Sequence, residues 1–399
     1  MPDLYDLYYR INGKTQLIYY YYDETNRYLG LEYGNIKKDY IYSDLSEDAL
    51  RRLKQIDLFT GIKTITQEII YDDSSVINGT ATTRIQEITY DLKLNHNYYF
   101  RYNYDNRGNI IEIIVQKRHE KSIPKRVCEI YDADGNPICT IKYERKVVLE
   151  TIEKSNYEYD NLNQLIREDV NASKRYTMIY EYDNYGNILM KKKYSYQYGT
   201  STNKLTGTPE VINYEYNNNL WSDQLTKFNG KNITYDESGN PIRIEKDPDN
   251  YLILTWEGRE LVEYKEYKNG TIYQIITYKY NDSGYRTYKK IESEGNIKEH
   301  FYYLEGSKVK CEEINDNGTI YKIFYTYDID GSLISFKLNT EEYFYIRNLQ
   351  GDIVSIVDKN GNIEVEYQYD AWGNIIYQTD SDLARINPYR YRGYPEFAS

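Results

Sequence analysis

The chain has 399 residues, a formal net charge of −12 at pH 7, and 52 tyrosines against 8 phenylalanines and 3 tryptophans. Binding to phosphate backbones needs clustered Lys and Arg, so this acidic balance excludes nucleic acid as an expected partner. The sequence also lacks the roughly 18 consecutive apolar residues of a membrane-spanning helix and the basic and apolar regions of a signal peptide, so we expect neither in this chain.

The N-terminal residues have the pattern of β-strands. Residues 8–11 and 16–19 flank Asn12-Gly13, a dipeptide typical of two-residue hairpin loops. Residues 29–33 continue the alternation of large and small side chains. We interpret residues 1–95 as degenerate β-hairpin repeats.

Residues 46–56 admit two interpretations. Ser46 could cap a short helix whose apolar stripe includes Leu50 and Leu53. The same residues resemble a degenerate hairpin turn that begins at Asp48 and has Arg51 where glycine is usual. The sequence does not separate the two, and we slightly favour the turn.

A ten-residue pattern dominates the rest of the chain, and its clearest copy is residues 366–375, Glu-Tyr-Gln-Tyr-Asp-Ala-Trp-Gly-Asn-Ile. In a strand, Tyr367 and Tyr369 point to one face of the sheet. Asp370 begins a tight turn because its carboxylate can accept the backbone N–H two residues later. Gly373 supplies the positive φ near the end of that turn. The pattern predicts a β-hairpin.

The pattern recurs at spacings of roughly 20 to 30 residues, about the length of two strands, a turn and a connector. Close copies lie at residues 102–110 and 180–188, and two variants at 131–138 and 235–242 carry a proline after the turn. We therefore predict that residues 96–399 are a repeat array, continuous with residues 1–95 as one repeat domain. The expected structural turn residues are Asp105, Gly108, Asn109, Asp132, Gly135, Asp183, Gly186, Asn187, Asp236, Gly239, Asn240, Asp370, Gly373 and Asn374.

Cysteine and histidine indicate no metal or catalytic centre. Cys128 and Cys139 flank one turn, so a cross-strand disulfide is the alternative to the buried free thiols that we expect for them and for Cys311. The three histidines are isolated from one another and from a cysteine cluster. The turn role explains each repeat aspartate, so we expect no catalytic residue, no metal and no cofactor.

The ordered series of Tyr-x-Tyr-Asp-x-x-Gly-Asn motifs resembles the YD repeats of the Rhs family. That family includes bacterial polymorphic toxins, the C component of the insecticidal Tc toxins and, more distantly, the teneurins. Residues 221–236 resemble the Trp-x-Asp-Gln-Leu segment of bacterial members. Residues 348–375 resemble the Rhs-associated core, and residues 387–394 resemble the sequence with which that core approaches its end.

The resemblance implies an all-β fold in which repeated hairpins form a long, curled antiparallel sheet, a partial YD-repeat shell or barrel around a C-terminal cargo. The family's core continues beyond its match to Tyr394, so we expect a truncated core without its cargo. The implied function is that of a non-enzymatic shell segment that encloses or presents a toxin cargo of a longer parent. The implied location is secreted or at the cell surface, by way of that parent or a non-classical route.

Two further expectations concern partners. Final strands at residues 375–378 and 389–391 would present open edges, which favour self-association. The alternative function is carbohydrate binding or adhesion, with glycans as partners, because tyrosine rings stack on sugars while their hydroxyls donate hydrogen bonds.

Overall fold

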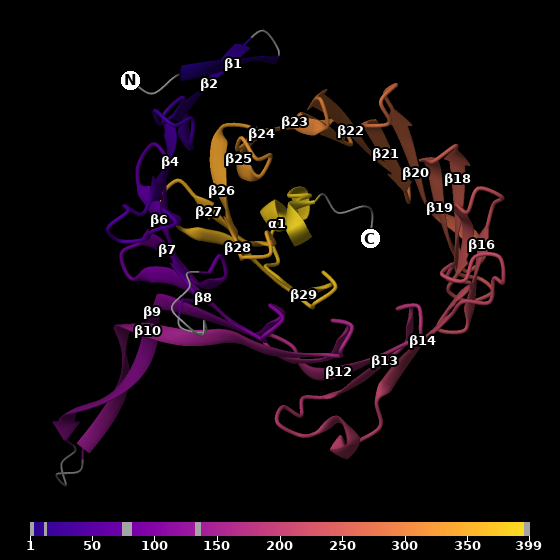
Figure 1. The fold of residues 1–399 in the computed structure, drawn as a ribbon, viewed down its shortest axis with the longest axis horizontal. Coiled ribbons are helices and arrows are strands. Elements are labelled where there is room, and N and C mark those ends of the chain that lie inside the picture. The colour runs from indigo at the N-terminus through magenta and orange to yellow at the C-terminus, as the bar shows by residue number, and fades with distance from the viewer. Residues whose placement is uncertain (1–3, 12–13, 74–81, 132–136, 395–399) are drawn as a thin grey trace. The chain divides into compact units, whose positions relative to one another are not determined.

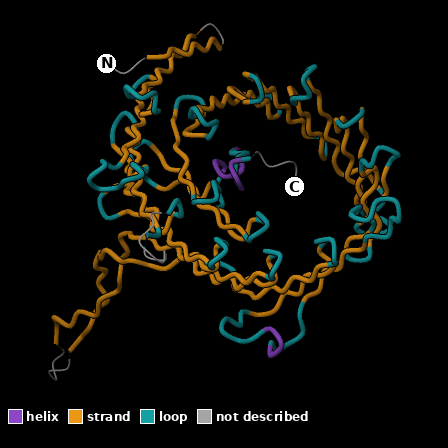
Figure 2. Tube along the Cα trace, in the orientation of Figure 1, coloured by secondary structure: helices purple, strands orange, loops and turns teal. Residues whose placement is uncertain are grey.

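The computed structural model describes residues 4–11, 14–73, 82–131 and 137–394. Strands make up nearly all of the regular structure in these residues, and helix is limited to short turns (Figure 2). The paired strands are antiparallel and joined mostly by tight turns. The prediction of an all-β protein built from repeated antiparallel hairpins is confirmed.

The described chain forms two compact units. Unit 1 comprises Met1–Tyr157, Val170–Lys174 and Ile346–Ser399, and unit 2 comprises Glu158–Asp169 and Arg175–Tyr345. The predicted boundary at residue 95 concerns the regularity of the repeats, which these contacts do not test, and it stays a prediction.

In unit 1 each strand from β1 to β10 pairs with the next strand along the chain. The elements of this unit are β1 (Leu4–Ile11), β2 (Lys14–Tyr22), β3 (Tyr28–Tyr33), β4 (Ile36–Tyr42), β5 (Leu53–Phe59), β6 (Thr64–Tyr71), β7 (Ile85–Lys93), β8 (His96–Tyr104), β9 (Ile110–Tyr131), β10 (Pro137–Tyr159), β27 (Ile353–Asp358), β28 (Ile363–Tyr369), β29 (Ile375–Gln378), α1 (Asp382–Ile386) and the 3₁₀ turn η2 (Tyr391–Gly393).

In unit 2 the strands from β12 to β26 pair in the same neighbour-to-neighbour order. The elements that lie wholly or mostly in unit 2 are β11 (Leu165–Asn171), β12 (Arg175–Tyr182), β13 (Ile188–Ser195), η1 (Thr202–Lys204), β14 (Glu210–Glu215), β15 (Lys227–Phe228), β16 (Lys231–Tyr235), β17 (Pro241–Glu245), β18 (Tyr251–Glu257), β19 (Glu260–Lys268), β20 (Thr271–Tyr280), β21 (Arg286–Ser293), β22 (Asn296–Glu305), β23 (Lys308–Asp316), β24 (Thr319–Tyr327), β25 (Leu333–Leu338) and β26 (Glu341–Arg347), and the last two residues of β11 and of β26 belong to unit 1.

The YD turns share one hydrogen-bond pattern. Asp105 Oδ1 accepts the backbone N–H groups of Arg107 at 2.9 Å and Asn109 at 2.8 Å, and Oδ2 accepts Asn109 Nδ2 at 2.8 Å. Gly108 has a φ of 93°, and its N–H donates to the Asp105 carbonyl at 3.1 Å. One aspartate therefore satisfies the backbone donors of a whole turn. Equivalent carboxylate bonds recur at Asp183, Asp236, Asp358 and Asp370.

A second regular feature, which we call the tyrosine latch, explains part of the tyrosine content. The tyrosine before the aspartate or asparagine that begins the turn donates its hydroxyl to a backbone carbonyl near the start of a strand in the preceding hairpin. Tyr104 donates to Ile85 at 2.6 Å, Tyr182 to Leu165 at 2.7 Å, and similar bonds are made by Tyr71, Tyr235, Tyr280, Tyr327 and Tyr369. The ring packs as an apolar group while the hydroxyl satisfies a carbonyl at the end of the ladder, a combination that phenylalanine cannot supply.

The segment at residues 46–56 forms a turn and then β5. Asp48 Oδ1 accepts the Leu50 N–H at 2.9 Å and Oδ2 accepts the Arg52 N–H at 3.1 Å, as in the regular YD turns. Arg51 has a φ of 48°, at the position where the regular turns have glycine. The turn interpretation is confirmed, and the helix alternative is wrong.

Two sequence-based expectations are wrong. Cys128 and Cys139 lie opposite each other on β9 and β10 and form a disulfide, so the expectation that both are buried free thiols fails, whereas Cys311 is free and buried. Residues 389–391 do not form a strand. Tyr389 makes an isolated bridge, and Arg392, within η2, has a φ of 55°. The expected open edge there is absent, and self-association stays a prediction.

Candidate functional site

The feature of unit 1 that the pairing of successive strands does not predict is the position of residues 346–394, here called the C-terminal segment. Strands β27 and β28 lie beside β7, β8 and β9 (Figure 1). Apolar side chains from both sets are buried, and full burial of each such side chain stabilises the fold by roughly 1.5–3 kcal/mol. They are Ile88, Leu92, Phe100 and Val115 from β7–β9 and Ile353, Ile356, Val357 and Val365 from β27 and β28.

Polar contacts fix the register of the C-terminal segment. The Tyr90 hydroxyl donates to the Arg347 carbonyl at 3.0 Å, and the Tyr102 hydroxyl accepts the Leu349 N–H at 3.0 Å. At the far end of β27, a Cβ on Gly361 would lie only 2.2 Å from the Leu92 carbonyl oxygen. Close backbone approach therefore requires glycine at this turn. Burial raises the pKa of Tyr90 to about 12, so its hydroxyl remains a donor at neutral pH.

Asn387 holds the last part of the segment. It is 1% exposed, and its Nδ2 donates to the Tyr389 carbonyl at 2.6 Å and to the Tyr367 hydroxyl at 3.2 Å. The following residues then bond to the start of β27: the Ile353 N–H donates to the Arg390 carbonyl at 3.0 Å, and the Arg392 N–H donates to Asp352 Oδ1 at 2.9 Å. Residues 387–392 are thus held by side-chain bonds and one backbone bond in place of an ordinary strand ladder.

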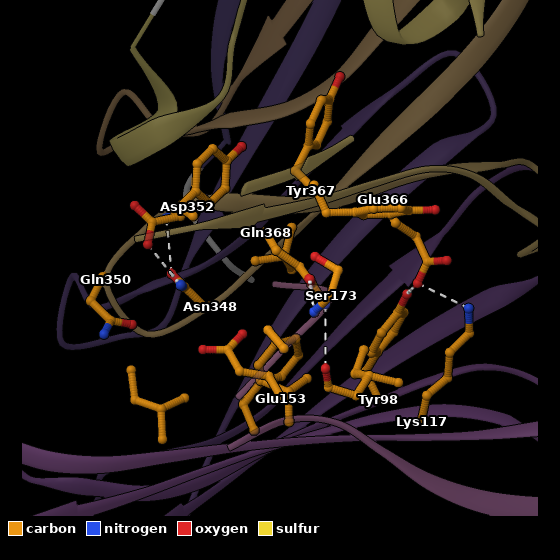
Figure 3. A pocket seen from close by; sticks show the side chains of 18 of the residues that line it. Tyr98, Lys117, Glu153, Ser173, Asn348, Gln350, Asp352, Glu366, Tyr367 and Gln368 are labelled. Atoms are coloured by element: carbon orange, nitrogen blue, oxygen red, sulfur yellow. Dashed lines mark hydrogen bonds and ion pairs between the residues drawn. The ribbon is translucent and has the colours of Figure 1, made fainter. Parts of the chain in front are cut away.

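A cavity of about 460 Å³ lies between the C-terminal segment and β8–β10 (Figure 3). Gln368 crosses it: its Oε1 accepts the Ser173 N–H at 3.1 Å, and its Nε2 donates to the Ile152 carbonyl at 3.4 Å. The lining is mixed, with aromatic rings, amides and carboxylates. Its side chains include those of Tyr98, Lys117, Glu153, Tyr157, Asn348, Gln350, Asp352, Glu366, Tyr377 and Tyr391.

Two sets of ionisable groups in the cavity are paired with one another. Glu366 accepts the Tyr98 hydroxyl and Lys117 Nζ, the latter at 2.9 Å. Burial, and then the Glu366 charge, raises the pKa of Tyr98 well above its usual value, so the phenol stays a donor. On the same lining, His119 Nε2 lies 3.0 Å from Glu150 Oε2. This geometry suits binding and anchoring, because each paired group is already held by its neighbour.

The predicted turn residues do not assemble into one site. Asp105, Gly108, Asn109, Asp183, Gly186, Asn187, Asp236, Gly239, Asn240, Asp370, Gly373 and Asn374 each lie in their own turn, and Asp132 and Gly135 lie outside the described residues. Only the turn of Asp370 adjoins the C-terminal contacts, where a Cβ on Gly373 would lie 2.5 Å from the Tyr391 ring. Among the described residues, no group of three or more His, Cys, Asp or Glu side chains could hold a metal ion.

No sequence motif marks the residues that build the cavity. Alternation in residues 366–369 indicated that Glu366 and Gln368 share a face, but nothing in the pattern showed which strands that face meets. Tyr98, Lys117 and Asn387 carried no motif of their own. Their roles depend on contacts between residues more than 200 positions apart, except for Asn387, which bonds locally to Tyr389.

Residues 139–393 match the family described as the teneurin YD-shell. The chain belongs to this family. The predicted relationship to Rhs and YD-repeat proteins is thereby confirmed. This YD-shell chain is 34% identical over 237 residues to the tRNA3(Ser)-specific nuclease WapA of Bacillus spizizenii, a match that covers 59% of the chain and 9% of the relative. It is 23% identical over 340 residues to Teneurin-3 of Mus musculus, covering 80% of the chain and 10% of the relative.

Solved structures show the same fold. In the crystal structure of TcdB2-TccC3-Cdc42, the match to this YD-shell chain has a TM-score of 0.52 at 16% identity and covers 96% of the chain and 19% of that protein. The chain thus spans about a tenth of the length of these curated relatives. No helix in the described part of the chain has the length and apolar character needed to span a bilayer.

Proposed function

We propose that this chain is a non-enzymatic wall segment of an Rhs/YD shell that encloses or presents a C-terminal cargo domain of a longer protein. The observation that carries the proposal is the docking of the C-terminal segment on β7–β9 through buried apolar side chains and the bonds of Tyr90 and Tyr102 to its backbone. Within the segment, the bonds of Asn387 hold its last residues. A domain attached after this segment would start from a fixed point on the wall, because residues 387–392 are held by bonds to β27.

Similar proteins support a toxin as the cargo. The WapA relatives are named as tRNA nucleases, and the matching solved structure contains TccC3. The shell segment matches only a small fraction of each relative, so the activity that gives WapA its name belongs to the relative as a whole. We propose that this chain reaches the cell surface or the outside as part of a longer parent.

We propose that the chain has no enzymatic activity, because its candidate catalytic carboxylates already accept hydrogen bonds from neighbouring groups. The described turn aspartates accept the N–H groups of their own turns, and the Glu366 carboxylate in the cavity accepts two donors. Enzymatic activity of this chain without a cargo would need catalytic groups other than the turn aspartates and Glu366. Incubation of the purified chain with total tRNA should leave the RNA intact, and cleavage by the chain alone would contradict this part of the proposal.

Protease protection tests the shell function. One protein carries a small protease-sensitive reporter after Ser399, and a control carries it before Met1. We expect slower digestion of the C-terminal reporter than of the N-terminal one. Asn387→Ala should reduce the difference, because it releases the segment that positions the reporter. Equal digestion of both reporters in the unchanged chain would contradict the proposal.

The cavity supports a second candidate function, carbohydrate binding. Tyrosine rings beside amides and carboxylates are typical of sugar sites. The tyrosine latches weaken the broader form of this idea, because those hydroxyls already donate to carbonyls. A glycan array distinguishes sugar binding in the cavity from sugar binding by the repeat tyrosines. Binding that is lost in Gln350→Ala and kept in Tyr104→Phe supports the cavity. An array without any binding excludes both forms.

A further inference from the structure

The hairpin of β9 and β10 is much longer than the others. β8 pairs with β9 only from Tyr104, opposite Ile110, to Asn97, opposite Arg118. Beyond Arg118 the described residues of β9 pair with β10 alone, and Figure 1 shows this ribbon extending away from the other strands of unit 1. We call residues 117–128 and 139–150 the arm. At about 3.3 Å per residue it reaches roughly 30 Å beyond β8.

The charge of the arm is opposite to that of the chain. It contains eight Lys or Arg residues and three Glu, whereas the whole chain has a net charge of −12. Most of the arm lies farther than the Debye length of about 10 Å at 0.1 M salt from the other strands, so salt screens it from the acidic remainder of the chain. An anionic partner can therefore approach the arm without meeting the rest of the chain at close range.

The two faces of the arm differ. From Thr140 to Thr151 the pairing with β9 has no bulge, so directly opposed residues share a face. One face, here the lysine face, has its charges paired: Glu150 lies 3.0 Å from His119 and 3.6 Å from Lys121, and Glu144 lies within 4 Å of Lys125 and Lys146.

The opposite face, here the arginine face, combines three arginines and one carboxylate, Glu120 opposite Val147, with exposed apolar side chains. Ile141 is 67% exposed, Tyr143 73% and Leu149 57%. Opposite Ile141 and Leu149 on β9 lie Arg126 and Arg118, and Arg145 lies between Tyr143 and Val147 on β10. None of these three arginines makes an ion pair with a residue that the structure describes. Within the described part of the chain, this face therefore presents arginines without ion pairs beside exposed apolar groups.

We propose that the arginine face of the arm binds the surface of an anionic lipid bilayer. The chemistry of the face selects this partner: guanidinium groups attract anionic headgroups, while Ile141, Tyr143 and Leu149 enter the boundary between headgroups and acyl chains. Tyrosine is itself enriched at this boundary. An acidic protein or polymer would use the charges but would leave the apolar side chains in water, and an apolar protein would leave the arginines unpaired.

The disulfide keeps the arm in the required form. A two-stranded ribbon without further neighbours is marginally stable in water. The Cys128–Cys139 bond joins the strands near the tip, at a directly opposed pair on the arginine face. The cross-link limits the unfolded states of the ribbon, so the arginine and apolar side chains stay on one face.

Vesicle co-sedimentation with the full chain tests the proposal. We expect binding to phosphatidylcholine vesicles that contain phosphatidylglycerol and little binding to phosphatidylcholine alone. The variant R118Q/R126Q/R145Q should bind at least about tenfold more weakly, because each basic residue near such a surface contributes to binding. K121Q/K125Q/K146Q is the matched control: it removes the same charge from the lysine face and should weaken binding by less than about threefold.

A second variant separates lipid from other polyanions. I141S/Y143S/L149S keeps every charge and should also lose most vesicle binding. If the unchanged chain and this variant both bound to immobilised polyglutamate and neither bound vesicles, the partner would be an acidic polymer and the proposal would be overturned. Equal losses of vesicle binding in R118Q/R126Q/R145Q and K121Q/K125Q/K146Q would overturn the assignment of binding to the arginine face. Thermal melts and the intact-mass signature of the disulfide confirm that each variant is folded.

Discussion

The C-terminal segment and the arm belong to the same unit and use similar residues, including Tyr, Ile and Arg, but they place them differently. In the C-terminal segment, Ile353 and Ile356 are fully buried, and the Arg390 carbonyl accepts the N–H of Ile353 in β27. In the arm, Ile141 and Tyr143 are mostly exposed and Arg126 has no ion-pair partner among the described residues. The difference in burial comes from the neighbouring strands. The C-terminal segment packs on β7–β9, whereas the arm runs past the end of its neighbour β8.

The fold depends on the positions in the first segment more than on those in the arm. Substitutions where the C-terminal segment approaches β7–β9 should destabilise the protein strongly, and substitutions on the arginine face should not. The following changes are arranged by the expected size of their effect.

Gly361→Ala should have the largest effect, a loss of about 3 kcal/mol in the free energy of unfolding. A Cβ at this position overlaps the Leu92 carbonyl and also meets a φ of 76°. Gly318→Ala is the control, because its φ of 91° imposes similar strain and a Cβ there has no atom within 4 Å. Urea unfolding should show a loss of about 1–2 kcal/mol for the control. Equal losses would show that the docking contact does not exist.

Asn387→Ala should cost about 1–3 kcal/mol, because it leaves buried polar groups without their donor. Asn374→Ala is the matched change on an exposed turn, where Nδ2 donates to Asp370. Water can replace that bond, so the urea midpoint should move by less than half as much. A larger shift for Asn374→Ala would contradict the role given to Asn387.

Tyr104→Phe should cost about 1 kcal/mol through loss of the tyrosine latch to Ile85. Tyr99 is on the same strand, and its hydroxyl has no hydrogen-bond partner among the described residues, so Tyr99→Phe should change stability by only a few tenths of a kcal/mol. Comparison of the two thermal midpoints isolates the latch, and equal midpoints would show that the latch contributes no stability.

Acid should weaken the YD turns. The side-chain bond from Asn240, followed by backbone N–H bonds, lowers the pKa of Asp236 below its usual 3.8. A group whose pKa is lower in the folded state contributes stability above its unfolded pKa, and that contribution is lost as pH falls through the folded value. Asp236→Asn should therefore reduce the loss of stability below pH 4, a smaller change than Tyr104→Phe causes. Asn281, which accepts the same N–H bonds in its own turn, shows that asparagine can occupy this position.

The smallest effect is expected on the arm. R118Q/R126Q/R145Q should change the free energy of unfolding by no more than about 0.5 kcal/mol, because these side chains are exposed and without ion pairs in the described structure. Chemical denaturation measures it. A loss comparable to that of Asn387→Ala would mean that the arm is docked, which removes the contrast between the two segments.

The repeat could be predicted from sequence because its information is local. Asp105, Gly108 and Asn109 form their turn from five consecutive residues, so spacing alone identifies the geometry. The same logic identified the degenerate turn at Asp48. The tyrosine latch was missed because Tyr104 and Ile85 meet only after two strands have paired.

The candidate site could not be predicted because its residues meet only after distant strands pack together. Glu366 meets Tyr98 and Lys117 across more than 200 residues, and the repeat is too regular to show which two faces pack together. The length of the arm was also not predicted. Its basic strands continue the alternation of a normal hairpin, and the turn motif read from the sequence at residues 131–138 keeps the repeat spacing.

Hydrogen exchange at three backbone amides tests the central claim, that the C-terminal segment is docked on the wall of unit 1. Leu349 N–H donates to the Tyr102 hydroxyl, Ile353 N–H to the Arg390 carbonyl, and Arg392 N–H to Asp352. None of these bonds belongs to a strand ladder. Protection at Leu349 reports docking on the wall, because its partner Tyr102 belongs to β8. Protection at Ile353 and Arg392 reports that the last residues of the segment are held on β27. The account predicts slow exchange at all three and faster exchange at Ile353 and Arg392 in Asn387→Ala. Exchange at the rate of an unstructured peptide in the unchanged chain would contradict it.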